Sequence, residues 1–362
     1  MQKKLIALAV AALASGAAFA QSNVQIYGSI DMGFSHRGDA IEDGIKSQNA
    51  IDSGISAGNR LGFKGTEDLG NGLKALFTME AGFQADTGEH AQSGALFGRQ
   101  VFVGLTGGFG TAIAGRLYTP HYSFLSTIDP FKAGTVGRYN NTYGIDLNGL
   151  LDPVRVDNAV AYVSPSFSGF NVTAAYSNNA IGQEVEGNGK QQNRVYAILP
   201  RYTNGPIDVA LNYHQIKMNE GSAIDDITNW LVGGTYDFGM AKLAAFYSSN
   251  KIDYDGATDD LKVKNWMLGV TVPFGKHAVL ASYNYSKAKQ AGEDGKSKQW
   301  ALGYTYSLSK RTNIYAAYAD ISNDDGNDDL VRASVSGDAS NKPLTGEQGY
   351  QNGLQFGVKH TF

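Results

Sequence analysis

Residues 300–308 read WALGYTYSL, and this stretch decides the fold class. Positions 300, 302, 304, 306 and 308 hold Trp, Leu, Tyr, Tyr and Leu, whereas Ala, Gly, Thr and Ser fill the positions between them. An apolar residue at every second position indicates a β-strand, because successive side chains of a strand point to opposite faces of the sheet. Segments 171–176, 230–238 and 266–272 repeat the pattern. The sequence therefore predicts an all-β protein.

The second face of these strands is polar but rarely charged. It is rich in Gly, Ser, Thr and Asn, whereas a soluble β-sandwich would expose a strongly charged face. Apolar residues facing lipid, alternating with polar residues facing a wet lumen, are typical of an outer-membrane β-barrel. Aromatic residues near the strand ends match the girdles of such barrels; they are Tyr27, Tyr162, Tyr176, Tyr213, Tyr236, Tyr247, Tyr283, Tyr306 and Tyr318.

The connections alternate in length, as they do in a barrel with short periplasmic turns and long external loops. Seven short turns and eight long loops separate sixteen predicted antiparallel strands. The strands are expected at 23–36, 58–68, 72–84, 97–106, 110–118, 155–163, 169–178, 191–202, 206–217, 227–237, 240–251, 261–272, 276–287, 296–307, 311–321 and 350–362. The long loops are expected at 37–57, 85–96, 119–154, 179–190, 218–226, 252–260, 288–295 and 322–349. The first and last strands should pair and close the barrel.

One predicted strand departs from the alternation. Residues 99–105 read RQVFVGL, and both faces of this strand are apolar. Two explanations stay open: the strand is buried on both sides beneath an infolded loop, or it contains a β-bulge.

The first twenty residues have the three parts of an export signal. Lys3 and Lys4 form a positive region, residues 5–13 are apolar, and Ala18-Phe19-Ala20 is an A-x-A cleavage site. The predicted division is a signal peptide at 1–20 and an outer-membrane barrel at 21–362. Loss of Lys3 and Lys4 changes the formal charge from −4 to −6. The mature chain is expected in the outer membrane of a Gram-negative bacterium.

Composition and motifs argue against several other functions. The 30 Lys+Arg and 34 Asp+Glu are spread along the chain, which argues against a nucleic-acid binder, because such a protein would show a basic patch. The absence of Cys removes thiolate metal sites and cysteine nucleophiles, and the six His lack metal-ligand spacing. Residues 54–58, GISAG, match the G-x-S-x-G motif of hydrolases, but a polar loop precedes them and a strand follows. We expect neither a catalytic residue nor a cofactor.

Several segments together resemble the general porins of Gram-negative bacteria, of the betaproteobacterial and neisserial type. The segments are 24–31 (VQIYGSID), 60–75 (RLGFKGTEDLGNGLKA), 103–116, 157–165 and 357–362 (GVKHTF). The resemblance covers essentially the whole mature chain. It implies a sixteen-stranded barrel, a homotrimer, and passive diffusion of small hydrophilic solutes and ions. It also implies that the third external loop folds into the lumen as a constriction, a place that 119–154 occupies.

The resemblance places a cluster of arginines on the wall facing that loop. The matching positions in this sequence are Arg60, Arg99 and Arg155. Strand alternation adds Lys74, Glu80 and Arg116 as further candidates on the pore wall, and the opposing loop offers Asp129, Asp146 and Asp152. Because rings of charged side chains set the selectivity of channels, we expect a transverse field at the constriction and a modest preference for anions.

The C-terminal residue, Phe362, resembles the recognition signal that the barrel-assembly machinery reads. The implied partners are this machinery, outer-membrane lipids and lipopolysaccharide, and small solutes, with no nucleic acid.

Three other functions stay open: a barrel enzyme such as a lipase or protease, a solute-specific channel, and a surface-adhesion barrel. The first would need a Ser/His or Asp/His constellation, and the second would place aromatics along the lumen.

Overall fold

A computed structural model describes residues 23–40, 47–92, 94–143, 151–184, 192–256, 259–324, 333–335 and 349–362. The strands are β1 (Asn23–Ala40), β2 (Gln48–Ser53), β3 (Arg60–Gly70), β4 (Leu73–Gly82), β5 (Gln100–Gly107), β6 (Gly110–Tyr118), β7 (Arg155–Val163), β8 (Phe170–Ser177), β9 (Arg194–Asn204), β10 (Ile207–Lys217), β11 (Ile224–Asp237), β12 (Lys242–Tyr254), β13 (Leu261–Phe274), β14 (His277–Gln290), β15 (Glu293–Ser307), β16 (Thr312–Asn323) and β17 (Tyr350–Thr361). The helices are α2 (Pro120–Ile128) and a short 3₁₀ turn at Tyr139–Asn141. The predicted signal peptide lies outside the described residues and stays a prediction.

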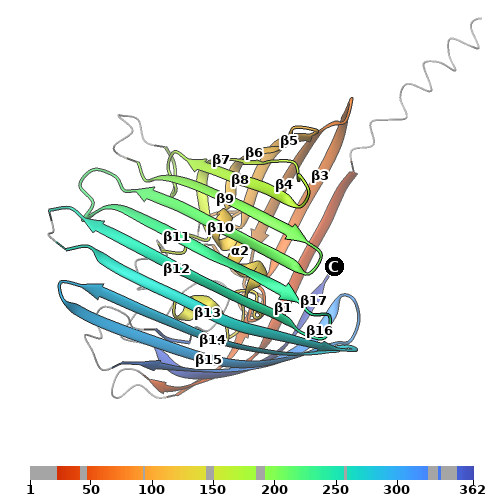
Figure 1. The fold of residues 1–362 in the computed structure, drawn as a ribbon. Helices are drawn as coiled ribbons and strands as arrows, with labels where there is room; N and C mark the ends of the chain where they lie inside the picture. Colours follow the sequence, from red (N-terminus) through yellow and green to blue (C-terminus); the bar gives the residue numbers. More distant parts are fainter. Residues whose placement is uncertain are drawn as a thin grey trace, which may run out of the picture.

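The strands form one closed antiparallel barrel (Figure 1). β1 pairs with β17 from Ser29↔Thr361 to Ala40↔Tyr350, and this pairing closes the sheet. β2 and β3 lie one after the other along the opposite edge of β1, so they occupy one position in the wall. The wall therefore has sixteen positions, as predicted. Closure leaves the described sheet without a free edge, whose unpaired N–H and C=O groups would each cost several kcal/mol in lipid.

Two details of the predicted connections are wrong. The expected loop 288–295 is a two-residue turn, because β14 runs to Gln290 and β15 begins at Glu293. Ala291 (φ 51°) and Gly292 (φ 88°) both have positive φ, the geometry that matches the right-handed twist of a hairpin. The expected loop 37–57 contains the end of β1 and all of β2.

β5 is regular, and its inner face is covered. Val101, Val103 and Leu105 are exposed on the outer face, and the registers with β4 and β6 contain no bulge. Phe102 faces inward and packs against a buried cluster that includes Leu117 and Leu151. The first explanation for its two apolar faces, burial beneath an infolded segment, is therefore correct.

The infolded segment is residues 119–143 with 151–154, which we call the inner loop. Its helix α2 lies inside the barrel against β9, β10 and β11 (Figure 1). Thr119 caps the helix through its hydroxyl, which accepts a hydrogen bond from the Tyr122 N–H (3.1 Å), and Pro120 occupies the first turn. One apolar core lies between this helix and the inner wall, and it includes Phe124, Leu125, Ile128, Leu199, Leu231, Phe246 and Met267. Among the described residues, no helix is long and apolar enough to cross a membrane.

Candidate functional site

The inner loop lies directly on glycines of the barrel wall. A Cβ atom at any of four inward-facing glycines would lie 2.6–3.1 Å from a side chain of the loop, closer than ordinary van der Waals contact. We call these glycines the glycine track; the pairs are Gly233 with Ile128, Gly269 with Pro130, Gly303 with Phe131, and Gly353 with Val136. The loop can approach the wall this closely because glycine has no side chain.

The tip of the inner loop is shaped by Asp129. Its carboxylate accepts hydrogen bonds from the N–H groups of Phe131 (3.1 Å), Ala133 (2.8 Å) and Tyr139 (3.4 Å). These bonds hold a turn in which Lys132 and Ala133 both have φ 55°, a strained conformation for residues other than glycine. Burial raises the pKa of Asp129 to about 6, against the opposing effect of these hydrogen bonds. Asp129 is therefore buried in the loop, whereas Lys132 is exposed.

Asp152 is also held beneath the inner loop. Its Oδ2 accepts a hydrogen bond from the Tyr139 hydroxyl (2.5 Å), and its Oδ1 lies 3.5 Å from Nε2 of His121. Burial raises the pKa of Asp152 to about 7. Asp146 lies outside the described residues. The two described loop acids therefore do not face the arginines across the pore, and the loop presents Lys132 instead.

A second inward segment, residues 54–59 between β2 and β3, contacts the inner loop. The Ile55 carbonyl accepts a hydrogen bond from the Thr135 N–H (2.6 Å). Asp31 of β1 fixes this segment, because its Oδ2 accepts hydrogen bonds from the N–H groups of Ser56 and Ala57, both at 2.8 Å. The pore is thus narrowed from two sides.

Two of the predicted arginines meet at one tyrosine of the wall. Arg99 donates from Nη2 to the Tyr118 hydroxyl (2.6 Å) and from Nε to Oε1 of Glu80 (2.7 Å). Arg155 donates to the same hydroxyl (3.0 Å), and its guanidinium lies 4.7 Å from the centroid of the Tyr118 ring. Arg99 is buried and Arg155 is half-buried. Tyr118 and Glu80 therefore keep two guanidinium groups in fixed positions.

Arg60 lies beside this pair. It donates from Nε to the Gly58 carbonyl (3.2 Å) and is within electrostatic range of Arg99 and Glu80. Glu80 also accepts a hydrogen bond from Tyr27 (3.0 Å), so Tyr27 faces the lumen. The prediction that Tyr27 belongs to the outer girdle is wrong.

Lysines extend the positive surface beyond the arginines. Lys64 of β3 lies over the Tyr27 ring, with Nζ 5.1 Å from its centroid. Lys359 of β17 is within electrostatic range of Arg60, of Lys132 on the inner loop and of Asp31. The pore wall and loop tip thus combine six cationic residues with Glu80 and with the buried carboxylates of Asp31 and Asp129. We call the six the basic constriction: Arg60, Lys64, Arg99, Lys132, Arg155 and Lys359.

Two other candidates lie apart from the basic constriction. Arg116 forms an ion pair with Asp157 and donates to the Gly98 carbonyl (2.8 Å), beside a register shift at Gly115 that breaks strict alternation. Lys74 lies opposite Asp68 at the periplasmic end of β4. At about 3.3 Å per residue it is roughly 20 Å along the strand from Glu80.

Sequence reasoning missed Lys132 and Lys359 as members of the site. Lys359 alternates with the exposed Val358, so strand parity alone could have placed it on the inner face. Lys132 gave no such signal, because an irregular loop has no periodicity.

A closed sixteen-position barrel with a charged constriction formed by an inner loop defines a porin, a diffusion channel of the outer membrane. The chain belongs to the Gram-negative porin family, which it matches over residues 7–326. It is 34% identical to an outer membrane porin protein of Bordetella pertussis, over 87% of this chain and 93% of that protein. It is also 34% identical to outer membrane porin protein 32 of Delftia acidovorans, over the full length of both.

A solved structure agrees with this assignment. The fold superposes on an anion-selective porin from Comamonas acidovorans with a TM-score of 0.75, at 30% identity, over 94% of this chain and 100% of the other. The protein is therefore a porin of the Gram-negative outer membrane.

Proposed function

We propose that this porin passes small hydrophilic solutes and ions and favours anions over cations. The observation that carries the proposal is the basic constriction, in which six cations outnumber Glu80 and Asp31. Of the two described loop acids, Asp129 is buried and the Asp152 side chain is only 10% exposed. Arginine stays protonated at any working pH, so its charge does not titrate away. The relative from Comamonas acidovorans, which is anion-selective, supports the same direction.

A planar bilayer tests this proposal. The purified mature protein should form stable open channels, and under a tenfold KCl gradient the reversal potential should have the sign of an anion-permeable pore. A reversal potential of the opposite sign would reject the anion preference. Absence of any conductance would reject the channel itself.

A barrel enzyme is the less favoured alternative. His121 and His214 form an edge-to-face pair with ring centroids 4.9 Å apart, and both are fully buried between the inner loop and the wall. Ser56, from the G-x-S-x-G match, lies in the inward segment 54–59, and Asp31 binds its N–H. Neither the histidine pair nor Ser56 is positioned to attack a lipid or a peptide. This arrangement supports a channel without hydrolytic activity.

We also propose that the channel is a homotrimer, with strands β1 to β5 facing the other subunits. Tyr and Trp are enriched where a protein surface meets the membrane interface. Outward Tyr and Trp follow one another from β10 to β16: Tyr213, Trp230, Tyr247, Trp266, Tyr283, Trp300 and Tyr318. In the described parts of β1, β3, β4 and β5 the outward residues are mainly aliphatic or Phe, such as Ile26, Ile30, Leu61, Val101 and Val103. A surface covered by protein has this composition.

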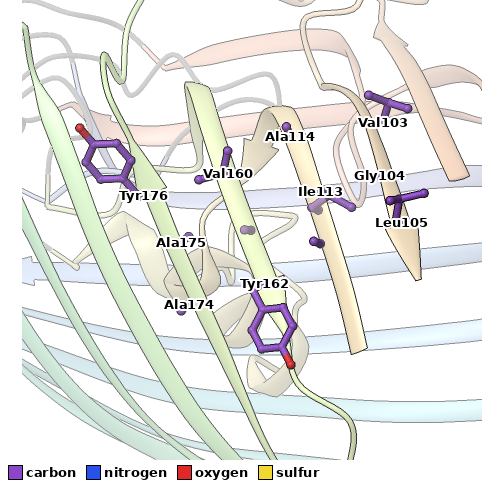
Figure 2. Close-up of a pocket in the computed structure, with 12 residues that line it drawn as sticks. Val103, Gly104, Leu105, Ile113, Ala114, Val160, Tyr162, Ala174, Ala175 and Tyr176 are labelled. Atoms are coloured by element: carbon purple, nitrogen blue, oxygen red, sulfur yellow. The ribbon is translucent and has the colours of Figure 1, made fainter. Parts of the chain in front are cut away.

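A groove of about 600 Å³ marks one border of that surface. Figure 2 shows Val103 and Leu105 of β5 on one side, Val160 and Tyr162 of β7 on the other, and the small Ala114 of β6 between them. The Tyr162 hydroxyl donates to the Phe109 carbonyl (2.5 Å), so its polar atom is satisfied within the chain. The apolar lining supports contact with side chains of a neighbouring subunit or with lipid tails.

Deleting Phe362 is expected to lower the amount of assembled channel in the outer membrane severalfold. The N–H and C=O of Phe362 pair with those of Gly28, both at 3.1 Å, while 44% of its surface is exposed. The deletion therefore removes little buried contact from a folded barrel but removes the terminal aromatic group that the assembly machinery is proposed to read. Heat-modifiable electrophoresis of outer-membrane fractions measures assembly, and thermal unfolding of refolded protein measures stability. Unchanged surface levels, or equal losses in both measurements, would contradict an assembly signal.

A further inference from the structure

Two tyrosine hydroxyls lie among the arginines of the basic constriction. Tyr118 is the last residue of β6, and Tyr122 lies in the first turn of the helix α2 of the inner loop. Their rings stack, with centroids 5.4 Å apart and 25° between the ring planes, and both residues are half-buried. One hydroxyl therefore belongs to the wall of the pore and the other to the loop. We call these two groups the hydroxyl pair.

The hydrogen bonds that Tyr118 accepts determine where its own proton can go. Its oxygen accepts one hydrogen bond from Arg99 (2.6 Å) and a second from Arg155 (3.0 Å), the residue opposite it on β7. A phenol oxygen has two lone pairs and one O–H, so the two guanidinium groups occupy both lone pairs. The O–H must therefore donate to a third group. Among the described residues, it donates to no acceptor.

The Tyr122 hydroxyl is the second donor in this region. Only the backbone N–H of Tyr122 is used, in the helix cap, and its hydroxyl forms no hydrogen bond with any residue that the structure describes. The side chain lies within electrostatic range of Arg60, Arg99 and Arg155. Asp152 is also in range, but the two side chains form no hydrogen bond. The Tyr122 O–H can therefore donate to an anion that the arginines attract.

We propose that the hydroxyl pair makes the constriction prefer small oxyanions such as carboxylates over halides of the same charge. The proposal rests on the anion preference proposed above and adds a chemical criterion to it. The six cations attract all anions of one charge, whereas an O–H group donates most strongly to an anion whose charge is concentrated on one or two oxygens. Such charge-assisted hydrogen bonds are short, at about 2.5–2.7 Å, and about twice as strong as neutral ones. Tyr118 and Tyr122 are thus specificity-determining residues.

The test compares Tyr122→Phe and the double variant Tyr118→Phe/Tyr122→Phe with a matched control, Tyr247→Phe/Tyr283→Phe. Each substitution removes only a hydroxyl, and the control removes two of them from the outward faces of β12 and β14, where both rings are exposed. Heat-modifiable electrophoresis shows whether each variant is a folded barrel. Bi-ionic potentials in a planar bilayer, with potassium chloride on one side and potassium formate on the other, give the ratio of formate to chloride permeability.

Formate permeability relative to chloride should fall in both variants of the hydroxyl pair. Because one hydrogen bond typically changes an equilibrium by about twofold to twelvefold, the ratio should fall at least about twofold in Tyr122→Phe and at least about fourfold in the double variant. The control should have the ratio of the wild type. Perchlorate spreads its charge over its four oxygens and accepts hydrogen bonds weakly, so its permeability relative to chloride should be the same in every variant.

Tyr122→Phe separates specificity from positioning, because it leaves both hydrogen bonds from the arginines to Tyr118 in place. If Tyr118 only held the arginines, the double variant would change formate and perchlorate permeability alike, and Tyr122→Phe would change neither. That result, or a formate ratio equal to the wild type in both variants, would overturn the proposal. The chloride-to-potassium ratio of the wild type tests the anion preference separately, since it depends on charges that none of these variants removes.

Discussion

Replacing Arg60 and Arg155 with alanine is expected to shift the reversal potential of the channel strongly toward cations. Both guanidinium groups are half-buried beside the pore, and each contributes a fixed positive charge. A unit charge at about 4 Å from an ion in water changes its energy by about 1 kcal/mol, which is about fivefold in occupancy. Two such charges change the occupancy of each ion by about 25-fold in dilute salt, upward for anions and downward for cations.

Salt dependence separates this local effect from the charge of the whole protein. The Debye length is about 10 Å at 0.1 M and about 3 Å at 1 M, so the selectivity of the wild type should decrease as salt rises. The double variant should show weaker selectivity and a smaller change with salt. Reversal potentials under a fixed concentration ratio, at several absolute concentrations, measure both quantities.

The matched control is Arg194→Ala with Arg311→Ala, which removes the same charge from the outward face of β9 and from an exposed turn. Arg99 is left unchanged because its removal would leave Glu80 buried without its ion-pair partner, a change that typically costs about 3–5 kcal/mol. Adding Lys132→Gln to the double variant should move the reversal potential further toward cations. If the double variant and the control behave alike, these arginines do not set the selectivity.

Replacing Gly303 with leucine is expected to displace the inner loop and at least halve the single-channel conductance. A Cβ at this position would lie 2.6 Å from the Phe131 ring, so the larger side chain must push that ring away from the wall. Overpacking of this kind costs about 1–3 kcal/mol, and the loop can reduce this cost only by moving into the pore. Conductance in a planar bilayer measures the narrowing.

A compensating variant distinguishes loop displacement from misfolding. Gly303→Leu combined with Phe131→Ala removes the ring that the leucine meets, and conductance should recover toward the wild-type value. Gly108→Leu serves as the control, because a Cβ at Gly108 has no neighbour within 4 Å. Persistence of the low conductance in the double variant, with normal barrel mobility on a gel, would show that the glycine track does not position the loop.

The sequence by itself determined the barrel. Alternation such as that at 300–308 specifies which face of a strand meets lipid. Once every strand has a lipid-facing side, the sheet must close, because lipid cannot hydrogen-bond the free backbone groups of an open edge. The same parity put Arg60 on the inner face and could have put Lys359 there. Local rules failed at the hairpin around Ala291-Gly292, where polar residues that resemble a loop continue the ladder up to a two-residue turn. They also failed at Gly115, where one unpaired residue changes the parity that follows.

Only the tertiary structure decided the polarity of the constriction. The path of the inner loop depends on contacts with Gly233, Gly269, Gly303 and Gly353, which belong to strands far away in the sequence. Those contacts place Asp129 and Asp152 beneath the loop and leave Lys132 exposed. The acidic residues of 119–154 suggested a negative wall opposite the arginines, but an irregular segment has no period from which the direction of a side chain can be derived. The contacts between the loop and the wall therefore determine where its charged side chains lie.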